Sequence, residues 1–96
     1  MLDTLIRNAR VVDGTGRAVF TADVGLRDGL IEAVGALGGA QAFEIIEADG
    51  RVLTPGFIDI HRHADAAGFR DSFGRAELSQ GLTTLVNGNC GMSLAP

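Results

Sequence analysis

The stretch Pro-Gly-Phe-Ile-Asp-Ile-His-Arg-His, residues 55–63, decides the expected fold. It is an apolar, β-branched run that ends in two histidines, His61 and His63. Because side chains of a strand alternate between its faces, both histidines are expected on one face, about 7 Å apart along the backbone. Two imidazoles at that spacing can bind one metal ion, since neutral imidazole is a common metal ligand. A motif this short is also compatible with two incidental histidines.

The residues around the histidines predict the start of a parallel α/β fold. The strand is two-sided, with isoleucines on one face and Phe57, Asp59 and the histidines on the other. This pattern suits a parallel barrel, where helices cover the outside and polar chemistry lies at the strand ends. A short helix is expected over residues 73–80, ended by Gly81, and the next strand over residues 82–86. A strand, helix and strand of this length predict two parallel strands joined by a right-handed crossover.

The first half of the chain is predicted to be a small antiparallel β module. Strand-like runs occupy residues 2–12, 21–27, 30–35 and 44–48. Turn residues separate them, and the Asp28-Gly29 pair between two strands is a strong hairpin signal. The pattern changes at Thr54-Pro55-Gly56, so we expect one domain over residues 1–54 and a second over residues 55–96.

Cys90 is the third candidate for metal binding. It lies in the glycine-rich segment Asn87–Gly91, directly after the second predicted strand of the parallel unit. A thiolate is a good zinc ligand, but a free cysteine is often only a small buried apolar residue, and the pattern leaves both roles open. As the only cysteine, it excludes a disulfide within the chain.

Two aspartates lie near the histidines. Asp59 shares their predicted face, so it can orient a ligand histidine from behind or cap local backbone. Asp65 can form a hydrogen bond with His63 or with a loop amide, and the sequence favours loop capping at least as much as contact with the histidine. Arg62 is predicted on the opposite face, so we assign it no catalytic role.

Composition excludes several classes of function. The net charge of −4 offers no clustered positive charge for nucleic acid. No apolar run approaches the roughly 20 residues that span a membrane, and no signal peptide precedes the first strand. We therefore expect a cytoplasmic, reduced protein without a nucleic-acid or membrane partner. With 46% apolar residues and a mean hydropathy of +0.22, the chain is not a disordered tail.

Taken together, these segments resemble the amidohydrolase superfamily. Residues 55–63 are similar to its first barrel strand, and residues 5–14 resemble the first β segment of those enzymes. Residues 80–96, with the Gly-Asn-Cys-Gly segment, resemble the N-acyl-D-amino-acid deacylase (D-aminoacylase) branch. The resemblance covers essentially the whole chain but only the N-terminal part of a family member. Family members often read His-Thr-His where this chain has Arg62 between the histidines.

The resemblance implies a fold and an activity. The fold would be the N-terminal part of a small β-sandwich followed by the first two strands of a TIM-like metal-dependent hydrolase barrel. The activity would be zinc-dependent hydrolysis of the amide bond of N-acyl-D-amino acids, with His61, His63 and Cys90 as metal ligands. The number of metals stays open, because Cys90 can serve the main site while the histidines hold a weaker second metal. The general base, an aspartate of a late barrel strand, is expected beyond Pro96.

A TIM barrel needs about 250 residues, so this segment is expected to act with the remaining C-terminal part of the enzyme or with a companion chain. Two alternatives stay open. The chain can be a catalytically inactive fragment that acts as a β interaction module and pairs with another chain or a second copy. It can also belong to another amidohydrolase, such as a cyclic-amide hydrolase or a deaminase. The side chain of the preferred D-amino acid is not specified by these residues.

Overall fold

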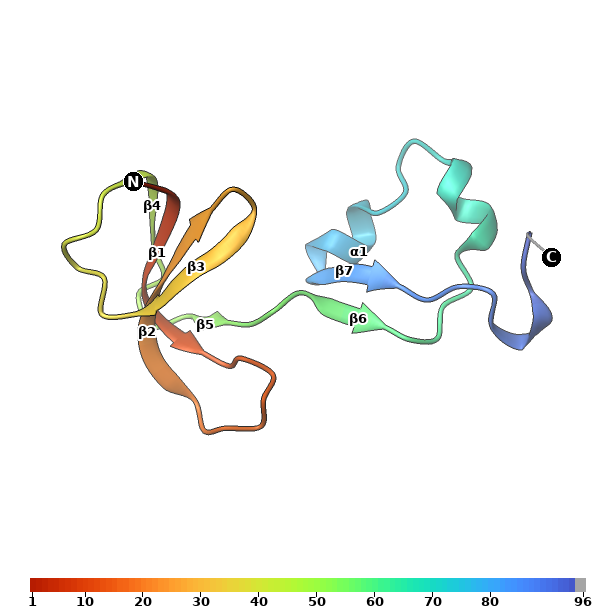
Figure 1. Ribbon diagram of the computed structural model, residues 1–96. Coiled ribbons are helices and arrows are strands. Elements are labelled where there is room, and N and C mark those ends of the chain that lie inside the picture. Colours follow the sequence, from red (N-terminus) through yellow and green to blue (C-terminus); the bar gives the residue numbers. More distant parts are fainter. Residues whose placement is uncertain (95–96) are drawn as a thin grey trace. The chain divides into compact units, whose positions relative to one another are not determined.

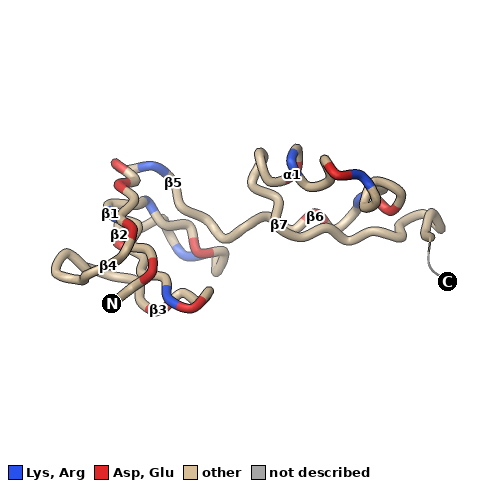
Figure 2. Tube along the Cα trace, turned by 90° about the horizontal axis from the view of Figure 1, so that it is seen from above, with Lys and Arg blue, Asp and Glu red and all other residues tan. Residues whose placement is uncertain are grey.

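The computed structural model describes residues 1–94 and divides the chain into two compact units, Met1–Pro55 and Gly56–Pro96 (Figure 1). The first unit contains strands β1 (Leu2–Val11), β2 (Phe20–Arg27), β3 (Leu30–Gly35), β4 (Ala42–Glu47) and β5 (Val52–Leu53). The second contains β6 (Phe57–Asp59), the 3-10 helix η1 (Asp65–Phe69), α1 (Arg75–Ser79), β7 (Leu82–Leu85) and the 3-10 turn η2 (Asn89–Gly91). Acidic and basic residues are interspersed along both units (Figure 2).

The first unit is a five-stranded sheet built around β1. Its strands follow the order β3-β2-β1-β4, and β5 also pairs with β1. β1, β2 and β3 are antiparallel neighbours, and the hairpin predicted at Asp28-Gly29 joins β2 to β3. Both turn residues have positive φ, 51° and 75°, which is the backbone that a two-residue hairpin turn requires.

The prediction of a purely antiparallel module was wrong for the last two strands. β4 pairs with β1 in parallel through residues 42–47, and β5 continues along the same edge in parallel. The run of turn residues marks where strands end but does not fix which neighbour the next strand joins. After β3, residues 36–41 carry the chain to the opposite edge of β1 and back to the level of Leu2, whose N–H bonds the carbonyl of Gln41, so β4 runs in the same direction as β1.

The sheet holds a small core of alanines and valines. The core cluster comprises Ala9, Val11, Ala22, Val24 and Ala48, and Leu5 on β1 is completely buried. Many larger apolar side chains of the same unit remain exposed; Phe43 on β4 is 77% exposed and Leu30 on β3 is 70% exposed. The sheet therefore leaves many of its larger apolar side chains uncovered.

The second unit begins as a strand, helix and strand. β6 and β7 are parallel neighbours, as predicted, and α1 contacts β7 (Figure 1). The predicted helix over residues 73–80 is shorter, because α1 spans Arg75–Ser79; the chain then turns at Gly81, whose φ is +83°. Within the described residues, no helix has the length and apolar character to cross a membrane.

The expected strand that carries both histidines ends before them. β6 stops at Asp59, so His61 and His63 lie in the loop that follows it. The β6–β7 pairing extends by only two more backbone bonds, from Val86 to Asp59 (2.8 Å) and from Arg62 to Val86 (3.2 Å). Alternation along a strand therefore does not place the two imidazoles; loop contacts do.

Candidate metal centre

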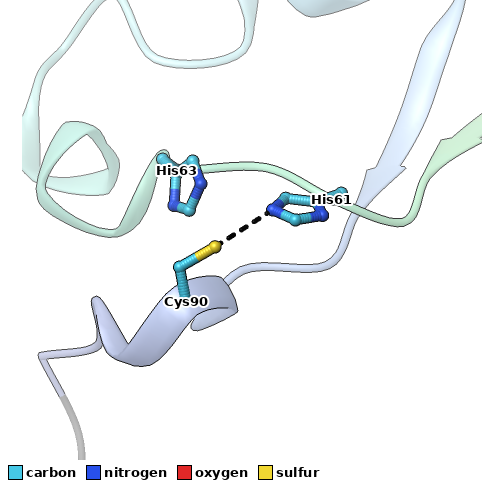
Figure 3. A group of neighbouring side chains, drawn as sticks. All are labelled: His61, His63 and Cys90. Atoms are coloured by element: carbon cyan, nitrogen blue, oxygen red, sulfur yellow. Dashed lines mark hydrogen bonds between the residues drawn. The ribbon is translucent and has the colours of Figure 1, made fainter.

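Three donor side chains meet where β6 and β7 end. His61 and His63 follow β6, and Cys90 lies in η2 after β7. Because β6 and β7 are parallel, their carboxyl ends lie at the same edge, which brings these loops together. One ligand atom from each of the three residues lies within 4.8 Å of the others, and all three side chains are exposed (Figure 3).

The distance between Cys90 and His61 fits a shared zinc ion. Sγ of Cys90 lies 3.5 Å from Nε2 of His61. The two imidazole rings are 5.2 Å apart between centroids, with their planes at 72°. Zn–N bonds of about 2.0–2.1 Å and a Zn–S bond of about 2.3 Å at a tetrahedral angle separate the nitrogen and sulfur by about 3.5 Å. Two imidazoles and one thiolate also form a donor set that binds zinc in preference to harder cations.

Backbone contacts hold the two loops against each other. The N–H of Ala64 donates to Oδ1 of Asn87 (3.2 Å). In return, the N–H of Gly88 donates to Oδ2 of Asp65 (3.3 Å). These two bonds run in opposite directions between the loops, so they resist both sliding and separation of the segments that carry the donors.

The aspartates contact backbone in the structure. Oδ1 of Asp59 accepts the N–H of His61 (3.1 Å), and its other oxygen lies 3.9 Å from the guanidinium of Arg62. Asp65 accepts the loop amide of Gly88. Of the two roles left open for each aspartate, capping of local backbone describes these contacts. Orientation of a ligand imidazole stays a prediction.

Asn89 and Glu77 were not anticipated from the sequence. The side-chain amide of Asn89 donates to the carbonyls of Val86 (2.8 Å) and Arg62 (3.3 Å). Glu77 on α1 accepts from Arg62 at 2.6 Å. For Asn89 the sequence did offer a signal: it is an asparagine directly before Cys90 in a turn segment, where side-chain amides commonly bond the backbone.

The backbone at Cys90 is unusual. Its φ is +58° and ψ is 25°, in the left-handed region. The other described non-glycine residues with positive φ are Asn8, Asp28 and Asp49, types that tolerate this conformation. A cysteine held there costs about 1–2 kcal/mol, and such outliers cluster at functional sites.

The fold and the cluster together define a candidate metal site, with nitrogen and sulfur donors on loops at the carboxyl end of a parallel β unit. Comparison with known proteins identifies the family of this chain. The model of the amidohydrolase family matches residues 44–95, and the model of the urease alpha-subunit N-terminal domain matches residues 1–55. The chain belongs to the amidohydrolase family.

Individual relatives agree with this assignment. The D-aminoacylase of Alcaligenes xylosoxydans xylosoxydans is 42% identical over 94 residues, which cover 98% of this chain and 19% of the relative. The crystal structure of N-acyl-D-glutamate deacylase from Bordetella bronchiseptica, complexed with zinc and a phosphonate inhibitor, is 45% identical with a TM-score of 0.92 and covers 99% of this chain and 20% of that one.

A crystal structure of D-aminoacylase is 43% identical with a TM-score of 0.93, over 100% of this chain and 20% of the enzyme. The chain thus spans about a fifth of the length of the relatives it matches.

Proposed function

We propose that this chain forms part of a zinc-dependent deacylase that hydrolyses the amide bond of N-acyl-D-amino acids. The observation that carries the proposal is the convergence of His61, His63 and Cys90 within 4.8 Å. The similarity to D-aminoacylase and N-acyl-D-glutamate deacylase supports the substrate class.

His61 and His63 would hold the ion through neutral imidazole nitrogens, and Cys90 through a deprotonated thiol. A bound zinc ion supplies Lewis acidity, which polarises an amide carbonyl. Within this segment the three donors are exposed. The general base and the remaining ligands are expected from residues beyond Pro96.

The test uses the full-length protein. We expect purified protein to contain zinc by elemental analysis and to hydrolyse N-acetyl-D-amino acids in preference to their L enantiomers. Hydrolysis of dihydropyrimidines instead would favour a cyclic-amide hydrolase. Absence of bound metal and of both activities would contradict the proposal.

Ligand variants show which residues hold which metal. His61→Ala, His63→Ala and Cys90→Ser should each lower zinc content and activity, whereas Asp71→Asn, an exposed change in the same unit, should leave both unchanged. If Cys90→Ser removes the activating metal while the histidine variants remove only a weaker second one, the protein binds two metals with separate ligands.

A further inference from the structure

Arg62 is bonded through all three of its polar groups. Its backbone N–H donates to the carbonyl of Val86 (3.2 Å), at the end of β7. Its carbonyl accepts the side-chain amide of Asn89 (3.3 Å), the residue before Cys90. Its guanidinium donates to Oε1 of Glu77 on α1 (2.6 Å). A single residue between the two histidines therefore links the strand end, the Cys90 turn and the helix.

The carboxylate of the Arg62–Glu77 pair is better shielded than the carboxylates of the other ion pairs in the described part of the chain, whereas the Arg62 side chain is 41% exposed. The Glu77 side chain is 13% exposed, whereas the carboxylates of the pairs Arg7–Glu47 and Arg27–Glu32 are 44% and 36% exposed. Removing one partner of a shielded pair costs more than in a solvent-exposed pair, because the charge left behind is incompletely solvated. The backbone N–H of Glu77 and the Arg62 guanidinium both lower the pKa of this carboxyl, and partial desolvation opposes them.

Fixing Arg62 restrains both histidines at once. His61 precedes it and His63 follows it, so any rotation of the peptide at Arg62 swings both imidazoles. Asn89 binds the Arg62 carbonyl and immediately precedes Cys90, so the same contact restrains the thiol. The distances among the three donor atoms thus depend on one anchored residue.

We propose that Arg62, through Glu77 and Asn89, is a positioning residue that sets the geometry and the zinc affinity of the His61, His63 and Cys90 cluster. This inference rests on the proposed metal-binding function of that cluster. It assigns Arg62 no contact with substrate.

The experiment measures metal binding by the full-length protein. Zinc affinity is determined by competition with a chromophoric chelator, and ligand geometry by the visible and thiolate charge-transfer bands of the Co²⁺-loaded protein. Arg62→Ala and Glu77→Gln should each weaken zinc binding about 10–100-fold, as loss of outer partners does elsewhere. Both should also alter the Co²⁺ bands at saturating metal, a change that a general loss of stability does not produce.

Two further variants make the role specific. The double variant Arg62→Ala/Glu77→Gln should bind zinc no more weakly than Arg62→Ala alone, because the two substitutions remove the same ion pair. Arg62→Lys should recover part of the affinity, since it keeps the charge but not the fork of donors. The matched control is Arg75→Ala. Arg75 lies on α1, as Glu77 does, but its guanidinium takes part in none of the ion pairs of the described residues.

The outcomes are distinguishable. Wild-type zinc affinity and unchanged Co²⁺ bands in Arg62→Ala or Glu77→Gln would overturn the positioning role and leave the metal site intact. Should Arg62→Ala fail to fold, Glu77→Gln provides the same test with less disturbance of the loop. A wild-type protein that binds neither Zn²⁺ nor Co²⁺ would overturn the proposed function and this inference with it.

Discussion

Cys90 combines a strained backbone with a ligand-capable side chain. Glycine adopts the left-handed region without the steric cost that cysteine meets there. The position thus keeps a thiol that the local backbone disfavours, which supports a role for the sulfur itself.

Substitution at position 90 should separate strain from ligation. Measured on metal-free protein, Cys90→Gly should raise the free energy of unfolding by about 1 kcal/mol, whereas Cys90→Ser should not. Both should lose zinc to the same extent. Thermal or urea denaturation of the two variants checks this, and equal stability of the glycine and serine variants would show that the backbone is not strained.

Gly56, before β6, is required because there is no space for a side chain at this position. A Cβ at this position would collide with the side chain of Thr83 on the neighbouring strand. We expect Gly56→Ala to destabilise the protein by about 1–3 kcal/mol, the usual cost of overpacking. Urea denaturation measures it. Gly68→Ala is the matched control, because a Cβ there meets nothing within 4 Å, and adding Thr83→Ala should recover part of the loss.

At the residue scale, the sequence indicated the three donors but not the contacts that place them. His61, His63 and Cys90 are rare residue types beside strand ends, so composition and spacing single them out. Asn89 contacts a carbonyl 27 residues away, and Glu77 lies 15 residues from its arginine. Neither partner follows from a local pattern. That the three donors bind metal stays a prediction.

Among the elements, β1 contains a bulge that depends on one carboxylate. The pairing with β2 shifts between Ile6 and Ala9, and Asn8 there has a φ of 54°. Asp23 on β2 accepts the N–H of Asn8 (3.0 Å) and that of Leu37 (2.9 Å). These backbone donors lower the pKa of Asp23 below its ordinary value of 3.8.

This contact should make stability depend on pH. Because the pKa of Asp23 is lower in the folded state, its contribution is fully present above the unfolded value of 3.8 and is lost as pH falls through the folded value. Asp23→Asn should therefore be less stable near neutral pH. The difference in urea midpoint between the two proteins should shrink from about pH 6 to about pH 3. A constant difference across that range would contradict the assignment.

The elements also show which features of a sheet can be predicted from local sequence. The Asp28-Gly29 hairpin was predicted because turn type and strand pairing are set by adjacent residues. The direction of β4 was not, because its partner β1 lies some 40 residues earlier in the chain. β6 was expected to extend to the histidines, but its pairing with β7 ends sooner than its apolar pattern does.

At the scale of the whole chain, uncovered apolar surface is the dominant property. Phe43, Leu30 and Ile60 are 77%, 70% and 75% exposed. Surfaces of this kind normally mark contacts with further protein. In a full-length family member they are candidates for burial by later segments; in a β interaction module they would bind another chain.

A 96-residue polypeptide of this sequence should therefore self-associate and lack deacylase activity. Light scattering with refractive-index detection measures its mass, since the chain has no Trp or Tyr. Phe43→Ser should reduce the association, because it removes a large exposed apolar side chain. A monodisperse monomer at micromolar concentration would contradict this expectation.

The central position of β1 has a consequence for synthesis of the chain. β1 is translated before all of its partners, yet one of its edges is completed only by β4 and β5, which end at Leu53. At roughly 5–20 residues per second, that edge stays unpaired for about 2–8 s while β2 already covers the other edge. During this interval a nascent strand edge is open to wrong partners, so chaperone contact with β1 at this stage would favour correct assembly.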